Sequence, residues 1–201
     1  DLHPDWSPAT IKSALMTTGT DVLDGGKPPA SENNPVLIFR QGAGHVQPNS
    51  AADPGLVFDS SFGDWLGFIC AVQPGGGCTG VPATDPSNLN TPSIAIGDLA
   101  GVQTVTRRVT NVGGNPATYT PSISGLAGFT TVVTPSSLSL AAGETKSFTV
   151  TFTRTTAALN GYTGGQMRLS DGTHTVRVPV VVRPVALAAP LQVGASYNVT
   201  F

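Results

Sequence analysis

Apolar and polar residues alternate with a period of two between residues 93 and 183. The apolar residues of three runs each form a single face: Leu138 and Leu140; Phe148, Val150 and Phe152; and Val176, Val178, Val180 and Val182. Such alternation is typical of half-buried strands. Turn-forming Gly, Pro, Asn and Asp residues separate the runs at positions 111–116, 125–128, 141–143 and 171–172. About seven short strands in roughly 90 residues predict an immunoglobulin-like or fibronectin-like β-sandwich.

A helical pattern occurs near the start of the chain. Ser7 is a favourable N-cap, and Pro8 suits the first helical position. The spacing i, i+3, i+4, i+7 of an amphipathic helix is kept by Ile11, Ala14, Leu15 and Thr18. Such a one-sided helix must pack on something, yet residues 24–35, DGGKPPASENNP, are predicted to form an exposed loop without apolar surface.

The segments between the helix and the alternating region have weaker patterns. The apolar residues 36–39 predict a short strand, and a small helical segment is predicted near residues 49–52. Residues 60–92 are interpreted as a linker, rich in Pro, Gly and Asn. We expect this linker to dock onto a neighbouring surface, because it is too apolar for a free tether at Phe62, Trp65, Leu66, Phe68 and Ile69.

The composition fits short strands and many turns. Charged residues make up 11% of the chain, against roughly 25% in an average soluble protein. Ten basic and twelve acidic side chains give a formal charge of −2, and Arg107 with Arg108 is the longest basic run, so a nucleic-acid partner is not expected. No apolar run approaches the roughly 20 residues that a bilayer requires, so no membrane span is predicted.

Two cysteines lie close together in the proposed linker. Cys70 and Cys78 are separated by a turn that contains Gly75, Gly76 and Gly77, which can bring their Cβ atoms within bonding range. Two cysteines make a poor metal site, and an extracellular setting favours pairing. We therefore expect a disulfide rather than two free thiols.

Several motifs resemble one family of enzymes. HPDWSPATIKSALMTTGTD, residues 3–21, resembles the segment that follows the nucleophile helix in subtilisin-like proteases, and GAGHVQPNSAADPGLVFD, residues 42–59, resembles the last strand and helix of their catalytic domain in the plant-type, cucumisin-like branch. The C-terminal fibronectin-III-like domain of that branch is resembled by PSIAI (92–96), TVTRRVTNVG (104–113), TPSSLSLAAGETKSFTVTF (134–152) and SDGTHTVRVPVVV (170–182).

The resemblance implies a mostly β chain with four parts. Residues 1–59 would be the C-terminal end, with the last helices and strand, of an α/β subtilisin-like catalytic domain, and residues 60–92 the linker. Residues 93–183 would be the fibronectin-III-like β-sandwich, and residues 184–201 a tail or the start of a further module. Ile11 and Leu15 would face the remainder of the catalytic domain, without which we expect the helix to be poorly protected.

The same resemblance implies a secreted serine endopeptidase that acts on proteins or peptides with a Ser-His-Asp triad. The family positions of the triad all precede Asp1, so no catalytic residue, no cofactor site and no metal site is assigned in this chain, which we expect to be inactive alone. Its partners would be the remainder of the catalytic domain and, through it, the substrates.

Other candidate sites have simpler structural explanations. A triad built on His3, His45 or His174 is disfavoured, because each lies in a segment that reads as a structural turn or hairpin. A calcium site at residues 21–32 lacks a regular ligand spacing. Arg107, on the core side of its strand, is interpreted as an edge or snorkelling residue rather than a substrate contact. For Trp6, which occupies a staple position with Ile11, and for Trp65, packing is preferred over sugar stacking. Residues 198–200 form a glycosylation sequon.

Two other functions compete with the protease interpretation. An independent adhesion or carbohydrate-binding sandwich would have no use for the helical stripe of the first 55 residues. A complete small enzyme would need a nucleophile and a base at a recognisable spacing, which the sequence does not offer.

Overall fold

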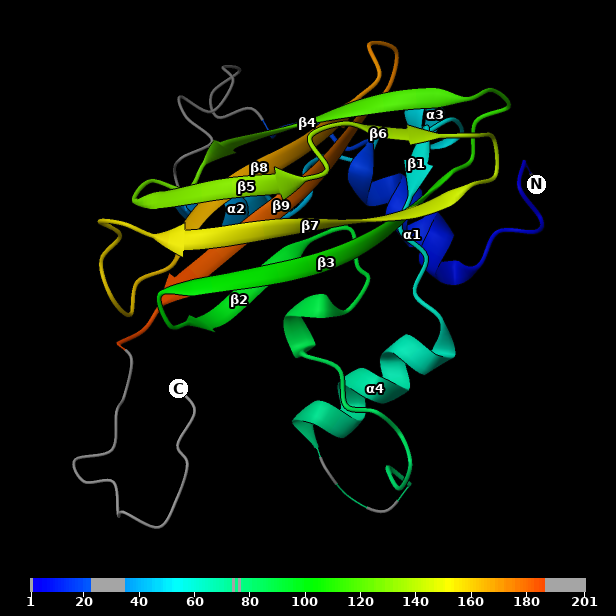
Figure 1. Ribbon diagram of the computed structural model, residues 1–201. Coiled ribbons are helices and arrows are strands. Elements are labelled where there is room, and N and C mark those ends of the chain that lie inside the picture. The colour runs from blue at the N-terminus through cyan, green and yellow to red at the C-terminus, as the bar shows by residue number, and fades with distance from the viewer. Residues whose placement is uncertain (1, 23–34, 74, 76, 187–201) are drawn as a thin grey trace.

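The computed structural model describes residues 2–22, 35–73, 75 and 77–186 (Figure 1). The sequon at residues 198–200 lies outside the described residues. So does the predicted loop at residues 24–35, except for its last residue. Within the described part, no helix is long and apolar enough to cross a membrane.

Two β-sheets form the body of the molecule. One has the strand order β1-β3-β7-β5, and the other has the order β2-β9-β8-β4-β6. The strands are β1 (Leu56–Val57), β2 (Ile94–Leu99), β3 (Val102–Asn111), β4 (Ala117–Gly125), β5 (Phe129–Thr134), β6 (Leu138–Leu140), β7 (Thr145–Arg154), β8 (Thr163–Ser170) and β9 (Thr175–Pro184). The mostly β sandwich predicted from the alternation is confirmed.

The core lies between the sheets and follows the predicted period. Inward-facing residues of β7 and β9, among them Phe148, Val150 and Val178, are almost completely buried. β3 and β7 pair antiparallel with Val105 opposite Val150, so that buried side chains meet buried side chains along the ladder. The turns predicted at residues 111–116, 125–128, 141–143 and 171–172 all connect successive strands.

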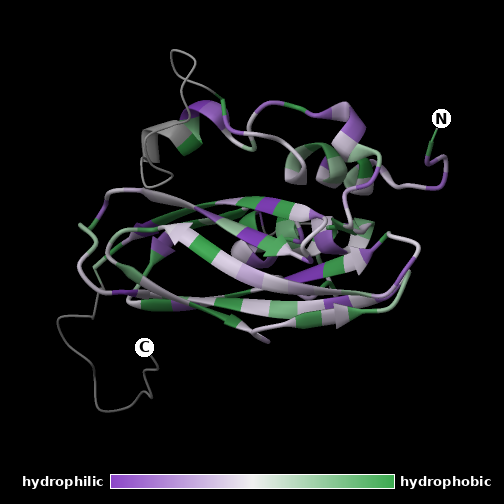
Figure 2. Cartoon of the chain, turned by 90° about the horizontal axis from the view of Figure 1, so that it is seen from above, coloured by the Kyte–Doolittle hydropathy of each residue, from purple (hydrophilic) through white to green (hydrophobic). Residues whose placement is uncertain are grey.

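A layer of helices covers the outer face of the larger sheet, as Figure 2 shows from above. We call α1 (Pro8–Thr17), α2 (Pro35–Gln41) and α3 (Pro48–Ala51) the helical layer. α1 contacts β9 and β1, while α2 contacts β8 and β9. Because β8 and β9 lie between the sandwich core and this layer, β9 is buried on both faces for most of its length, which explains the unbroken apolar residues at positions 178–182.

The strand predicted at residues 36–39 is wrong, because these residues belong to α2. A run of four apolar residues does not distinguish a strand from one turn of a buried helix. Pro35 begins the helix and has no N–H to lose there, and Ile38 is buried. The small helix predicted near residues 49–52 is present as α3.

The segment interpreted as a linker also contains a helix. α4 (Phe62–Val72) begins with a capping box, in which the Ser61 hydroxyl accepts a hydrogen bond from the Asp64 N–H and the Asp64 carboxylate accepts one from the Ser61 N–H. The motif S-x-x-D at residues 61–64 was the available sequence signal for this start. A short 3-10 helix, η1 (Pro86–Asn88), precedes β2.

Arg107 is not a snorkelling residue, because only 2% of it is exposed. β1 pairs only with Thr110 and Asn111, so beside Arg107 the edge of β3 is covered by residues 87–93 rather than by a strand. Its guanidinium donates hydrogen bonds to the carbonyl oxygens of Ser87 (2.7 Å), Ser93 (2.8 Å), Thr91 (3.2 Å) and Thr106 (2.8 Å). Burial lowers the pKa of Arg107 to about 10, so it remains a cation at neutral pH. The buried charge therefore ties residues 87–93 to the sandwich.

Candidate functional site

The three histidines make three different kinds of contact. The Nε2 of His3 lies 2.8 Å from the carbonyl oxygen of Ala52, and His45 forms an isolated backbone bridge with Thr20. The ring of His174 lies between two carboxylates, those of Asp171 and Asp53. None of these contacts joins an imidazole to a serine hydroxyl. Among the described residues no group of three or more His, Cys, Asp or Glu side chains is placed to hold a metal ion.

The candidate site is the contact between the helical layer and the sandwich, together with the surface that this layer leaves open. α1 begins where the Ser7 hydroxyl accepts a hydrogen bond from the Thr10 N–H at 3.0 Å, and Pro8 follows the cap. Near its end the hydroxyls of Thr17 and Thr18 donate to carbonyl oxygens one turn earlier. The helix is thus fixed locally by small polar side chains.

The inward face of α1 consists of small residues. Thr10, Ser13, Ala14 and Thr17 are buried, and Ala14 forms a small apolar cluster with Ala51 and Val57. The Ser13 hydroxyl accepts a hydrogen bond from the Phe58 N–H at 2.8 Å, next to β1. Small side chains let the helix approach β1 closely, so part of the packing that α1 requires is provided within this chain.

A buried arginine holds the end of this segment. Arg177 projects from β9 toward the helical layer, where its guanidinium donates to the carbonyl oxygen of Gly19 and pairs with the carboxylate of Asp21. Its Nε donates to the Gln166 side chain on the neighbouring strand β8 at 3.2 Å. Each of the three guanidinium nitrogens of Arg177 therefore has a partner, and the side chain joins residues 19–21 to the larger sheet.

The outward face of α1 is apolar and open to solvent. Ile11 is 47% exposed and Leu15 is 38% exposed, although both lie on the predicted stripe. They line a groove of about 410 Å³ between α1 and α3, together with Leu2, Trp6, Pro48 and Ala52. Trp6 stacks on His3 with 3.8 Å between ring centroids, which agrees with the packing role expected for Trp6. The stripe is thus divided, with its small residues turned inward and its large residues outward.

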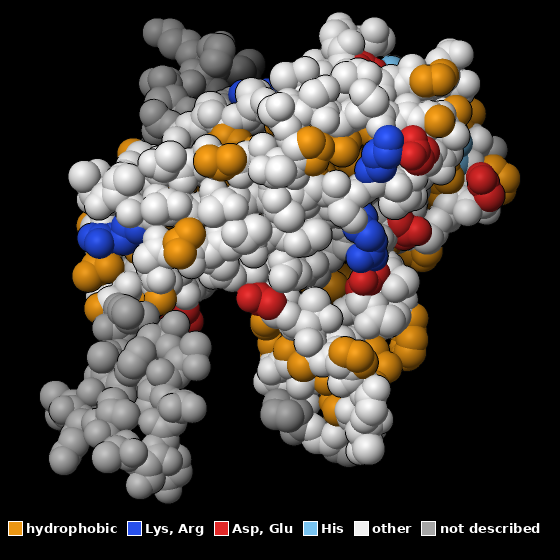
Figure 3. All heavy atoms as spheres, in the orientation of Figure 1, with side chains coloured by type: hydrophobic (Ala, Val, Ile, Leu, Met, Phe, Trp, Pro, Cys, Tyr) orange, Lys and Arg blue, Asp and Glu red, His pale blue; other side chains and the backbone are white. Residues whose placement is uncertain are grey.

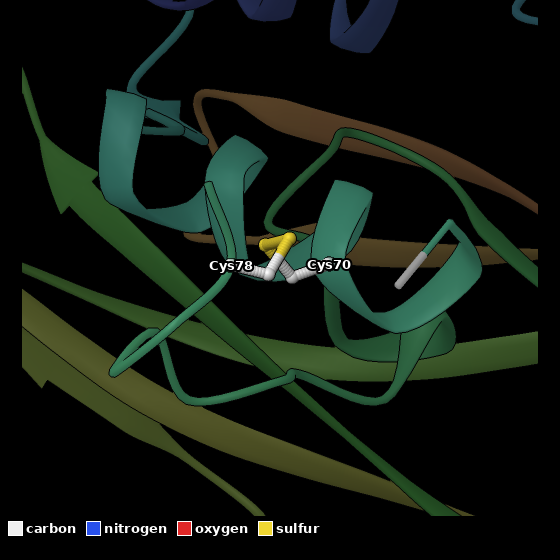
Figure 4. Close-up of a disulfide and its surroundings, with 2 residues drawn as sticks. All are labelled: Cys70 and Cys78. Atoms are coloured by element: carbon white, nitrogen blue, oxygen red, sulfur yellow. A yellow bond between two sulfur atoms is a disulfide. The ribbon is translucent and has the colours of Figure 1, made fainter. Parts of the chain in front are cut away.

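The lobe around α4 carries a second open apolar surface. Cys70 and Cys78 are joined by a disulfide with a Cα–Cα distance of 5.5 Å, which connects α4 to the chain that follows it (Figure 4). The outer side of α4 exposes Phe62, Trp65, Ile69 and Val72, and Figure 3 shows hydrophobic side chains gathered on this lobe below the sandwich. Asp64 pairs with Arg108 of β3 at 2.8 Å and so attaches the helix to the smaller sheet.

Comparisons with known proteins identify the region to which this chain corresponds. Residues 88–182 match the family model of a fibronectin type-III domain. The chain is 41% identical to subtilisin-like protease SBT2.6 of Arabidopsis thaliana over 199 residues, which cover 89% of this chain and 24% of that protein. The chain is homologous to plant subtilisin-like proteases.

Other subtilisin-like relatives give the same result. Identity is 40% to subtilisin-like protease SBT5.4 of Arabidopsis thaliana, over 90% of this chain and 25% of that protein, and 38% to subtilisin-like protease Glyma18g48580 of Glycine max, with the same two coverages. The chain thus spans about a quarter of the length of the curated relatives it matches. Among solved structures, a FixG-related protein from Vibrio parahaemolyticus aligns with a TM-score of 0.37 and 20% identity over 41% of this chain and 78% of its own, and we draw no functional conclusion from it.

The match to the fibronectin type-III model begins ahead of the predicted start at residue 93. The structure gives the physical reason. Besides the contacts of Arg107, the side chain of Asn90 accepts a hydrogen bond from the Arg108 N–H at 2.7 Å and donates one to the Arg108 carbonyl oxygen at 3.0 Å. Residues 88–92 have no alternation of their own, and side chains alone bind them to β3.

Proposed function

We propose that this chain is the C-terminal portion of a secreted subtilisin-like serine endopeptidase. In this proposal residues 1–59 form the C-terminal end of the catalytic domain, and residues 60–92 connect that domain to the sandwich of residues 93–183. Residues 184–201 extend beyond the sandwich. The Ser-His-Asp triad lies in the part of the protein before Asp1, and the substrates are proteins or peptides. The similarity over about nine-tenths of this chain to one quarter of each relative supports the proposal that the chain is one part of a longer protease.

In the proposed enzyme the sandwich supports the catalytic domain through the helical layer. The observation that carries this role is that α1 is packed on one face and leaves an apolar face open. Its small inward face is fixed on β1 and β9, whereas Ile11 and Leu15 present apolar surface outward. Covering two such side chains completely would contribute about 2 to 3 kcal/mol, since roughly half of each is already buried. In the proposed enzyme the remainder of the catalytic domain packs on Ile11 and Leu15.

The experiment that tests the proposal begins with the gene. The reading frame before Asp1 should encode a GTSMA-type motif with the nucleophilic Ser within a few tens of residues, and its absence would refute the proposal. In the whole enzyme, the variants Ile11→Asp and Leu15→Asp should lower the temperature at which activity is lost. The variant Val132→Asp, at an exposed position on the smaller sheet, serves as the matched control and should leave that temperature unchanged.

A further inference from the structure

Both nitrogens of the His174 ring face carboxylate oxygens. Nδ1 lies 2.9 Å from an oxygen of Asp171, three residues earlier in the β8–β9 turn, and Nε2 lies 3.2 Å from an oxygen of Asp53, in the segment between α3 and β1. A neutral imidazole has only one N–H, so it donates to one of these carboxylates and turns a lone pair toward the other. Only the imidazolium donates to both.

Asp171 is held in its ionised form by its surroundings. It accepts hydrogen bonds from the backbone N–H groups of Thr173 (2.8 Å) and His174 (2.6 Å) as well as from the His174 ring. Partial burial alone would raise the pKa of Asp171, but these hydrogen bonds outweigh it and lower that pKa to about 2. Tyr119 of β4 also bonds to Asp171, and its own pKa is raised by burial and by the charges of Asp171 and Asp53. Among the described residues, Asp171 and Asp53 are the charged groups that act on the His174 ring.

The same contacts join the sandwich to the end of the helical layer. Gly55, two residues after Asp53, adopts φ +74. Tyr119 and His174 pack so closely against it that a Cβ at this position would lie 2.4 Å from the Tyr119 hydroxyl. The Gly55 carbonyl oxygen accepts a hydrogen bond from the Val112 N–H at 3.0 Å, immediately beyond β3. Residues 53–55 are therefore held between the end of β3, Tyr119 of β4 and the β8–β9 turn.

We propose that His174 is a proton-dependent clamp, which fastens residues 53–55 to the sandwich when its ring is charged and loosens them when it is neutral. The proposal uses only contacts within this chain and stands whether or not the chain belongs to a protease. Exposed pairs contribute little, and Asp53 is 72% exposed. The clamp therefore changes a local opening equilibrium rather than the global fold.

The pH range of the clamp follows from the directions of the two pKa shifts. The hydrogen bond to Asp171, together with the contact to Asp53, outweighs partial burial and raises the pKa of His174 above its ordinary value of 6.5. The stabilisation is thus fully present below about pH 6.5 and is lost as the pH rises through the pKa of the folded protein.

The first experiment observes the His174 ring directly. In a ¹⁵N-labelled sample of the 201-residue chain, the ring nitrogens are titrated by NMR between pH 4 and pH 9. Both should carry a proton at pH 6, with a midpoint above about 6.5, and Asp53→Asn should lower that midpoint. A neutral ring at pH 6, or a midpoint that does not respond to Asp53→Asn, would overturn the proposal.

The second experiment measures the opening of the clamped segment. The reporter is the hydrogen-exchange protection of the Val112 amide, taken as a ratio to amides of β7 so that the intrinsic pH dependence of exchange cancels. Between pH 5.5 and pH 8.5 this ratio should fall about two- to fivefold in the wild type. It should stay low and constant in His174→Gln and follow the wild type in the control His45→Gln. A ratio independent of pH in the wild type would refute the clamp, and Asp53→Asn provides the same test if His174→Gln fails to fold.

Discussion

At the scale of single residues, this chain uses two buried arginines to attach irregular segments to regular ones. Arg107 and Arg177 are both almost completely buried, and each directs its guanidinium to backbone carbonyls of a segment that has little alternation or apolar content of its own. A buried cation is tolerated only when its donors are satisfied. These side chains therefore determine the placement of residues 87–93 and 19–21.

Replacement of Arg107 by alanine should destabilise the chain by about 2 to 4 kcal/mol, because three carbonyl oxygens of residues 87–93 lose their donor and a cavity remains. The neighbouring Arg108 is the matched control. Its side chain is 44% exposed and pairs with Asp64, so Arg108→Ala should cost less than about 1 kcal/mol. Urea unfolding of both variants measures the difference, and equal losses would contradict the role assigned to Arg107.

At the scale of elements, the helices differ from the strands in how much of their packing lies within this chain. Strands β3, β7, β8 and β9 each have two partners and a buried face. α1 and α4 each have one covered face and one open apolar face. The energetic consequences of substitution should therefore depend on the face rather than on the residue type.

The two faces of α1 give a direct comparison. Ala14→Asp places a charge without a partner in the cluster with Ala51 and Val57 and should destabilise the chain by more than about 2 kcal/mol. Ile11→Asp, one turn earlier on the open face, should cost about 1 kcal/mol or less. Chemical denaturation of the isolated chain is the measurement. If Ile11→Asp proved as destabilising as Ala14→Asp, the outward face would have to be covered within this chain.

The disulfide should act locally on α4. It closes a loop of only a few residues, Cys70 to Cys78, so the chain-entropy contribution is at most about 3 kcal/mol. The double variant Cys70→Ser and Cys78→Ser should raise hydrogen exchange in α4 while leaving exchange in β7 unchanged. Intact mass after alkylation without reductant tests the bond itself, and two modified thiols would show that it is absent.

At the scale of the whole molecule, the two sheets and the helical layer form three layers that are joined by shared contacts. The smaller sheet includes β1, which comes from the segment assigned to the catalytic domain and pairs antiparallel with β3. The larger sheet carries the helical layer on its outer face. The boundary proposed at residue 59 therefore passes through a shared sheet, so residues 1–59 and the sandwich should unfold together.

The isolated chain should hydrolyse neither casein nor peptide anilides above a buffer blank, because the proposed triad lies outside it. A serine-reactive phosphonate should leave its intact mass unchanged, with an active subtilisin as the positive control. A stoichiometric adduct on any serine of this chain would disprove the supporting role and require a nucleophile among residues 1–201.

The sequence by itself determined the class of fold and the positions of most strands. The alternation around residues 148–152 and 176–182 is a local property of the chain, and the turn residues between strands have conformational preferences of their own, so both are visible without tertiary contacts. The motifs at residues 3–21 and 104–113 indicated the family in the same way. The capping box at residues 61–64 was equally local, although the apolar and Gly-rich composition around it obscured α4.

Only the tertiary structure decided which apolar residues are covered and where the charges lie. Residues 36–39 lie in a helix that packs on β8 and β9. A run of four apolar residues is too short to reveal whether its period is that of a helix or of a strand. The α1 stripe divides between Ala14 and Ile11 because β1 admits only small side chains on one side. Arg107 took its role from partners 14 to 20 residues away in sequence, and His174 needs Asp53, about 120 residues away, in addition to Asp171 in its own turn. Such distant contacts are set by the packing of whole sheets, and no local pattern records them.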